Sequence, residues 1–334
     1  MVHVVFLKIA AMFLVILAGW LARRRGFLAA DFTTILSRLV VDVAFPALVF
    51  TQMLRIIDTA ALRVGWAGPL LCGLLIIIAY FIGLLLAPVF SGNAQRNTFI
   101  FLVAIPNWIF LPLPIAQALY GDSGVRTVLL CNAGAQLVLW SFGVWILHGE
   151  MRQAAKNLLR NVGLWATAVG IAVALLFPWA RNLETTDPAL PLAMMLPAAL
   201  VQALAMVGSL TIPMSLLAIG AQLGELTIAV NRFPRVLWGV LLSRLVFAPL
   251  ATVAIGVAMM KIGVAMMKIG VAIPEETRRI GYLIAVMPVA ISCSVMAERF
   301  HGDVTLAAES IFYSTFFSLL TVPVIFLLIQ RFGL

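Results

Sequence analysis

The amino-acid sequence predicts an all-α integral membrane protein with ten transmembrane helices in one membrane domain. Of its 334 residues, 63% are hydrophobic and only 10% are charged, and the mean hydropathy is +1.12. Soluble globular proteins carry about 25% charged residues. The apolar residues form long runs, and a spanning helix needs about 20 of them. This composition excludes a soluble enzyme, a nucleic-acid-binding module and a disordered scaffold.

Ten apolar runs lie between short clusters of Lys and Arg, as expected beside a bilayer. In the first half of the chain, residues 1–160, the runs are 4–22, 34–54, 65–90, 97–120 and 125–147. In the second half, residues 161–334, they are 162–180, 192–223, 236–258, 278–298 and 304–329. The first run is too long for a signal peptide, and its Arg cluster follows it. We therefore expect this helix to stay in the chain, with the N-terminus and the C-terminus both outside.

Two further features of the sequence receive structural interpretations. Gly256–Ile262 and Gly263–Ile269 both read GVAMMKI, and seven residues add about 10 Å of helix. We interpret the repeat as a duplication that prolongs the eighth helix; a lengthened gate is the alternative.

The three cysteines lie inside apolar runs and are expected to pack there, so we expect no disulfide, metal site or cofactor.

Prolines interrupt matching runs in the two halves. Pro46 and Pro106 lie in the second and fourth runs, and Pro213 and Pro288 lie in the seventh and ninth. A Gly-Asp pair follows both Pro106 and Pro288 at nearly the same distance. Because each half has five spans, the second half must be inverted in the membrane. Interrupted segments at matching positions of inverted halves indicate the binding site of a transporter.

The breaks at Pro106 and Pro288 predict half-helices whose N-termini meet near the middle of the bilayer. Proline removes a backbone donor and clashes with the preceding turn. Helix N-termini offer free N–H groups and about half a positive charge each, an arrangement that suits a carboxylate. Asn107 stands where it either donates its amide to such a ligand or simply caps its own half-helix.

Other polar residues near the breaks are further candidates for the substrate site. Ser292 and Ser294 either complete the site or bond back to their own helix. Asn132, Gln136 and Ser141 share one face of the fifth helix and either line the cavity or join helices. Trp108 either walls the pocket or packs in the core. The candidate substrate-binding residues are Asn107, Pro106, Pro288, Ser292, Ser294, Trp108, Asn132 and Gln136.

A few charged residues fall inside the spans and are candidates for coupling. Asp42 lies four residues after Arg38, so the two either form an ion pair, which we favour, or Asp42 carries protons. Glu309 is a second proton candidate. Arg244 is expected to face the interior or a cavity, where it attracts anions or pairs with a carboxylate.

The motifs around the breaks resemble those of the auxin efflux carrier family. The matching stretches are Ile105–Trp108, Leu113–Ile115 and Ala118–Gly121 for its fourth helix, Pro213–Gly220 for its seventh, Pro288–Ala290 and Ala297–Asp303 for its ninth, and Ser314–Leu319 for its tenth. The short chain resembles the prokaryotic branch, which includes bacterial carriers associated with malonate, beside the plant PIN-type auxin exporters.

This resemblance implies a five-plus-five inverted repeat, a crossover of helices 4 and 9, and elevator-type alternating access. It also implies a homodimer, as in the plant members, and places Pro106, Asn107 and Pro288 at the crossover and substrate site. Many bacterial members carry Asn where this chain has Ser292. The second polar contact with substrate therefore differs here.

The function expected is secondary transport of small organic anions, such as malonate or auxin-like acids, in a bacterial inner membrane. H+ is a candidate coupling ion, and transport driven by the membrane potential alone is the other option. The alternatives are an anion channel or a uniporter. An intramembrane enzyme is not expected, since the spans contain no paired carboxylates and no metal-binding spacing of His and Glu.

Overall fold

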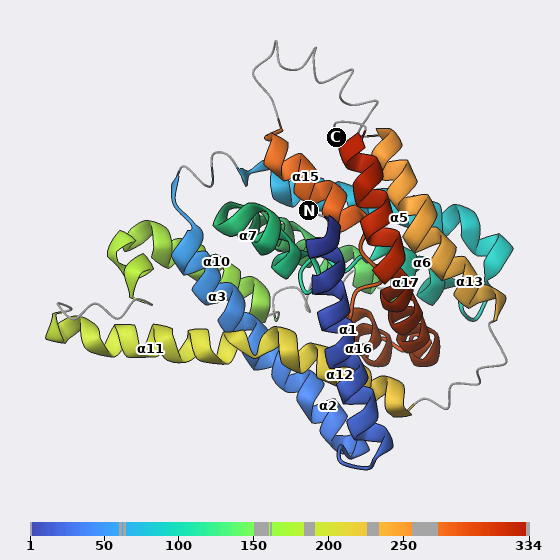
Figure 1. Ribbon diagram of the computed structural model, residues 1–334, viewed down its shortest axis with the longest axis horizontal. Coiled ribbons are helices and arrows are strands. Elements are labelled where there is room, and N and C mark those ends of the chain that lie inside the picture. Colours follow the sequence, from blue (N-terminus) through green and yellow to red (C-terminus); the bar gives the residue numbers. More distant parts are fainter. Residues whose placement is uncertain are drawn as a thin grey trace, which may run out of the picture.

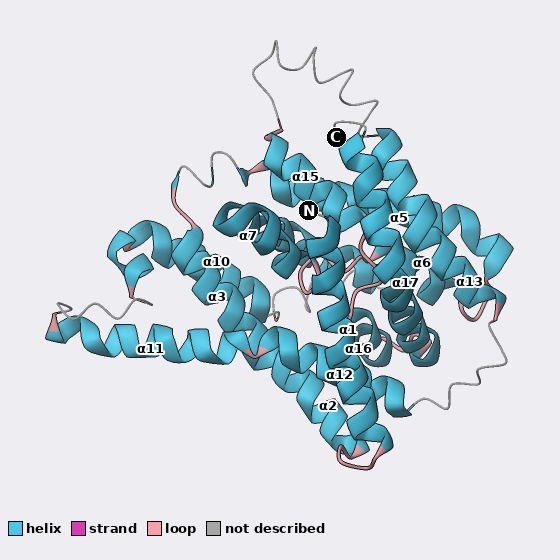
Figure 2. Ribbon diagram, viewed as in Figure 1, coloured by secondary structure: helices cyan, strands magenta, loops and turns pink. Residues whose placement is uncertain are grey.

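The computed structural model describes residues 2–59, 62, 65–149, 160, 162–183, 191–225, 234–255 and 273–331. These residues form helices joined by loops and turns, which confirms the all-α prediction (Figure 2). The tandem repeat at 256–269 lies outside the described residues.

The first half of the chain supplies helices that match the expected runs closely. They are α1 (Val2–Arg24), α2 (Ala30–Leu39), a π-helical turn (Val40–Ala44), α3 (Phe45–Ile56), α5 (Ala67–Phe90), α6 (Arg96–Ala104), α7 (Pro112–Val138), a second π-helical turn (Leu139–Gly143) and α8 (Val144–His148). The prediction that Pro46 breaks the second run is wrong, because a π-helical turn before the proline accommodates its missing N–H and the helix continues.

The second half repeats this alternation of long and short helices. Its elements are α10 (Val162–Leu176), a 3₁₀ turn (Pro178–Asn182), α11 (Leu192–Ser209), α12 (Thr211–Glu225), α13 (Arg235–Leu242), a π-helical turn (Ser243–Phe247), α15 (Glu275–Ala285), α16 (Ser292–Arg299) and α17 (Val304–Arg331). The seventh run is divided at Leu210, and Pro213 falls in the first turn of α12, where a proline is tolerated.

Five helical stretches in the described residues are long and apolar enough to cross a membrane. They are Ala67–Phe90, Pro112–Leu147, Leu192–Gly224, Arg235–Ile255 and Val304–Ile325. The stretch from Pro112 is two helices joined at Gly121, whose φ of 64° and ψ of −147° are accessible to glycine and strongly disfavoured for other residues. The break lies within the connection expected between the fourth and fifth runs.

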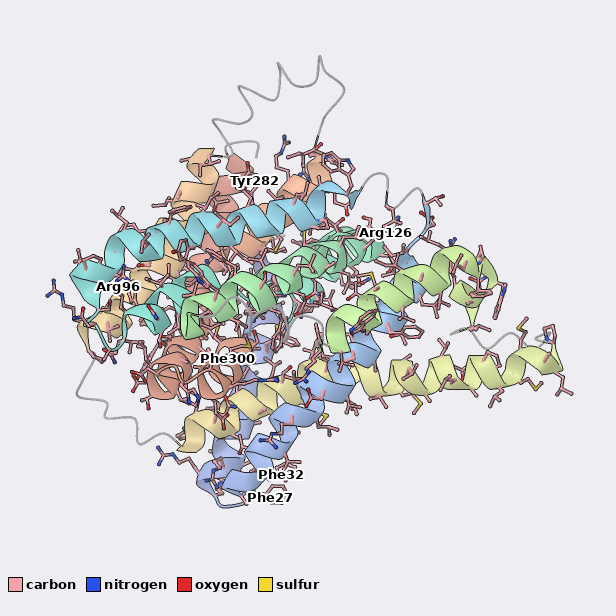
Figure 3. The ribbon with its side chains drawn as sticks, turned by 180° about the vertical axis from the view of Figure 1, so that it is seen from behind. Phe27, Phe32, Arg96, Arg126, Tyr282 and Phe300 are labelled. Carbon is pink, nitrogen blue, oxygen red and sulfur yellow. The ribbon has the colours of Figure 1, made fainter. Side chains whose placement is uncertain are left out.

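The helices form two groups that meet at the centre of the molecule (Figure 1). In one group α1 packs along α12, and α3 packs against α10 and α11. In the other, α5 packs on α6, α7 and α13, while α17 packs on α13 and α16. Figure 3 shows Phe300, at the end of α16, in the body of the protein, whereas Phe27 lies in the outer turn between α1 and α2 and Phe32 lies in the first turn of α2.

Candidate functional site

Two extended segments cross at the centre of the second group of helices. The first segment follows α6 and contains Pro106; the second follows α15 and contains Pro288. Pro106 and Val289 form an antiparallel bridge. The Asn107 N–H donates to the Pro288 carbonyl at 2.8 Å, and the Ala290 N–H donates to the Ile105 carbonyl at 3.1 Å. The two proline-interrupted segments therefore pair through their backbones, so each unwound stretch satisfies part of the other's hydrogen bonding.

A serine that the sequence analysis did not select supports this crossover. The Val289 N–H donates to Ser314 Oγ at 3.1 Å, and Ser314 is fully buried in α17. Its hydroxyl therefore satisfies a buried backbone donor that the crossing chain does not reach. The available signal was a run of hydroxyl residues, Ser314, Thr315 and Ser318, inside an apolar helix.

The half-helices after the crossover begin later than expected. The prediction that a helix starts directly after Pro106 is wrong, because residues 105–111 form the extended crossing and a turn before α7 begins at Pro112. Pro112 and Pro114 have no N–H, and the Leu113 N–H donates to the Ile109 carbonyl at 2.9 Å. The N-terminus of α7 therefore presents few free donors, so ligand donors must come from the turn itself.

Asn107 caps this turn and keeps its amide nitrogen available. Its side chain is 2% exposed, and its Oδ1 accepts the Phe110 N–H at 3.0 Å. Its oxygen therefore caps the turn after the crossing, whereas the N-cap position of α7 is Leu111, so Asn107 does not cap the half-helix itself. Because only the oxygen of an amide accepts a hydrogen bond, the cap also fixes which end of the side chain carries the two donors. In the part of the chain that the structure describes, Asn107 Nδ2 has no recorded partner, and Asn107 lines a cavity.

Backbone donors from both crossing segments accompany this amide. Within the described residues, no hydrogen-bond partner is recorded for the backbone N–H groups of Trp108, Ile109, Ile291 and Ser292. All four residues line the same cavity. The last two form the start of α16, where the helix dipole adds positive potential. Successive free N–H groups in a concave site favour an anion.

The cavity lies between the crossover and the other group of helices, and its volume is about 130 Å³. Five predicted site residues line it: Asn107, Trp108, Gln136, Ser292 and Ser294. Pro106 and Pro288 form the crossover behind it. Ser294 Oγ lies 3.3 Å from Gln222 Oε1 on α12, so the site connects the two groups of helices.

Neither Asn132 nor Ser141 is among the described residues that line the cavity, which was one of the two roles considered for them. Asn132 is fully buried and lies behind Trp108, whose Nε1 donates to Asn132 Oδ1 at 3.0 Å; it orients the indole and is not among the described cavity-lining residues. Ser141 bonds back to the Leu137 carbonyl of its own helix. Gln136 does face the cavity, and its Oε1 accepts from Trp140 Nε1 at 2.9 Å.

The charges at the cavity come from segments far apart in the sequence. Asp42, Arg160 and Arg299 line it, so cations outnumber anions. Arg299 lies over the Trp140 ring at 5.7 Å. The favoured pairing of Asp42 with Arg38 is wrong, since both side chains are exposed and no ion pair between these two described residues is recorded. Glu309 is partly buried in α17 and is not among the described residues that line the cavity.

Arg244 faces the interior, as expected, but it reaches neither an anion site nor a carboxylate. It is 2% exposed, and its guanidinium donates to the carbonyls of Val103 and Met287, both at 3.1 Å, and of Ala285. The prediction that it attracts anions or pairs with an acid is therefore corrected. Its partners are the carbonyl groups where α6 and α15 end.

Comparison with known proteins identifies the family to which the chain belongs. The family model described as membrane transport protein matches residues 4–160 and 151–326. An uncharacterized transporter of Methanocaldococcus jannaschii is 21% identical over 317 residues, which cover 92% of this chain and 94% of the relative. An uncharacterized transporter of Methanothermobacter thermautotrophicus is 25% identical over 325 residues, which cover 94% of this chain and 95% of the relative. The chain therefore belongs to the membrane transport protein family, which is the auxin efflux carrier family, and is a multi-pass membrane transporter and not an enzyme.

Proposed function

We propose that the protein is a secondary transporter of small organic anions that bind by a carboxylate at the crossover. The observation that carries the proposal is the set of unpartnered donors around the cavity: the Asn107 amide and the backbone N–H groups on either side of the crossing. Arg160 and Arg299 add positive charge to the same cavity. Convergent donors beside positive charges select for a negatively charged ligand.

The size and walls of the cavity narrow the class of substrate. An apolar cavity of about 150 Å³ holds a benzene molecule, and the volume here is about 130 Å³. This favours an anion with few atoms, such as malonate, over larger auxin-like acids. Trp108, Trp140 and Phe110 supply apolar wall, which accommodates the carbon part of the substrate.

The architecture proposed for transport is two inverted repeats, residues 1–160 and 161–334, with five spans each. In this scheme the group containing the crossover moves as an elevator against the group formed by α1, α3 and α10–α12. The extensive packing within each group and the cavity between them support this division.

The proposed setting is the inner membrane of a bacterium, with both ends of the chain outside. The resemblance to plant carriers favours a homodimer. A channel or a uniporter driven by the membrane potential is the alternative mechanism. The paired and buried backbone of Pro106 and Val289 favours a carrier over an open channel.

Labelled malonate uptake into proteoliposomes tests this function. We expect saturable uptake that an inside-positive potassium diffusion potential increases, because the carried species is an anion. Unlabelled malonate should compete, whereas malonamide, which has nearly the same shape and no charge, should not. Protein-free liposomes are the control. Absence of saturable uptake of malonate, monocarboxylates and aromatic acids alike would contradict the proposal, and single-channel current steps would favour the channel.

Proton coupling is tested at Asp42, the carboxylate that lines the cavity. If Asp42 carries the coupling proton, Asp42→Asn should make malonate uptake insensitive to an imposed pH gradient while uptake driven by the potential continues. Asp58→Asn is a suitable control, because Asp58 follows the end of α3 and is not among the described residues lining the cavity. An unchanged response of Asp42→Asn to the gradient would exclude Asp42 from coupling.

A further inference from the structure

The Arg244 guanidinium lies where two half-helices end. Its Nε donates to the Met287 carbonyl, its Nη1 to the Val103 carbonyl and its Nη2 to the Ala285 carbonyl. Val103 belongs to the last turn of α6, Ala285 is the last residue of α15, and Met287 follows it. One side chain from the π-helical stretch Ser243–Phe247 thus joins both segments that enter the crossover.

The carbonyl groups around the Arg244 guanidinium form a negative site that suits a cation. The last carbonyls of a helix have no partner within the helix, and each C-terminus carries about half a negative charge. Two converging C-termini therefore present about one negative charge, which one guanidinium balances. The planar fork of arginine reaches carbonyls in several directions at once. Each recorded hydrogen bond of Arg244 goes to a backbone carbonyl, and no carboxylate is recorded beside it in the described residues.

Broken-helix transporters generally divide their ligands between the two kinds of helix end. Half-helix N-termini face anionic substrates, whereas half-helix C-termini and unwound carbonyls coordinate the coupling cation. Here the donors at Asn107 and at the start of α16 face the cavity, and the C-terminal carbonyls face Arg244. No group of three or more His, Cys, Asp or Glu within the described ranges is placed to hold a metal ion.

We propose that Arg244 takes the place of a coupling metal cation at this crossover and that anion transport is therefore independent of Na+. The permanent charge holds the ends of α6 and α15 together, and this places the Asn107 amide and the free N–H groups around the cavity. Arg244 is thus a positioning residue, since it does not line the cavity itself. The expected independence of Na+ in transport rests on the proposed function. The assignment of Arg244 to a cation site does not.

The first test requires no substrate. Purified wild-type protein should melt at the same temperature in sodium chloride and in choline chloride. Arg244→Ala should melt at a lower temperature, because the carbonyls lose their partner. Millimolar guanidinium chloride should raise the melting temperature of Arg244→Ala by refilling the vacated site, and should not raise that of wild type. Arg235→Ala is the matched control, because Arg235 is exposed at the start of α13 on the same helix.

The second test uses malonate uptake in proteoliposomes. Wild-type uptake should be equal in sodium and in choline buffers. Arg244→Ala should lower uptake by about 10²-fold, the scale expected when binding groups are misplaced by about 1 Å, and guanidinium should restore part of it. Arg244→Lys should keep the positive charge and part of the uptake. If Arg244→Ala does not fold, uptake by Arg244→Lys is measured in its place.

The outcomes separate this inference from the proposed function. A sodium-dependent rise in wild-type uptake or melting temperature would overturn the inference, as would wild-type melting and uptake in Arg244→Ala or a failure of guanidinium to rescue it. If wild type carries no organic anion, the proposed function fails, and the melting experiments alone decide whether Arg244 occupies a cation site.

Discussion

Replacing Asn107 with Asp is expected to abolish transport of organic anions while leaving the fold intact. The carboxylate keeps the oxygen that accepts the Phe110 N–H, so the cap survives. It removes the two amide donors and places a negative charge beside the bound anion. Two like charges about 4 Å apart repel by about 4 kcal/mol at an effective dielectric constant of about 20. Uptake at low substrate concentration should therefore fall by about 10²- to 10³-fold.

Two measurements decide this prediction. Labelled malonate uptake reports the loss, and the melting temperature of the purified variant, within a few degrees of that of wild type, reports that the cap remains. Asn97→Asp is the matched control, because Asn97 is exposed in the first turn of α6, where an added carboxylate is tolerated. Wild-type uptake by Asn107→Asp would remove Asn107 from the substrate site and leave it as a cap.

Replacing Gly220 with Ala is expected to separate α1 from α12 and to destabilise the protein severely. An alanine Cβ at this position would lie 1.9 Å from the Ile16 carbonyl oxygen and 2.7 Å from the Trp20 nitrogen. Both atoms belong to the backbone of α1 and cannot rotate away. A Cβ added at Gly19 would lie 2.3 Å from the Leu217 carbonyl oxygen, so the approach is close from the other side as well. Small residues that let backbones touch drive helix association in lipid, so we expect a loss above about 4 kcal/mol.

Melting temperature and size-exclusion profile in detergent measure this effect. Gly73→Ala is the control, because it adds the same methyl group to a buried glycine of α5 whose nearest neighbour would be the Val138 Cγ2 atom at 3.4 Å, an ordinary contact. The control should behave as wild type. A Gly220→Ala protein that melts at the wild-type temperature would show that α1 and α12 do not pack at this distance in the membrane.

The features that could be predicted from the sequence depend on residues that are close together in the chain. Hydropathy located the spans because the bilayer requires long apolar helices. The prolines located the breaks at residues 106 and 288 because a missing N–H acts on its immediate neighbours. The same reasoning failed at Pro46, where a π-helical turn absorbs the defect, and at the start of α7, where two further prolines delay the helix.

The partners and positions of the charged and buried polar residues could not be predicted from the sequence. Arg38 and Asp42 are correctly spaced for an ion pair, yet both are exposed and Asp42 faces the cavity. Arg160 and Arg299 lie outside the expected spans, and the fold brings them to the same cavity. Spacing along one helix says which partners are possible, but solvent exposure and neighbouring helices decide which partner is chosen.

By itself, the sequence determined a multi-pass membrane transporter with two proline breaks and an amide at one of them. These features follow from composition and from residues adjacent in the chain. Only the tertiary structure decided that Ser314 supports the crossing, that Asn132 lies behind Trp108, and that Arg244 meets two helix ends. Each of these contacts joins residues from different segments of the chain, so it exists only after packing has brought the segments together and excluded water from the polar groups between them.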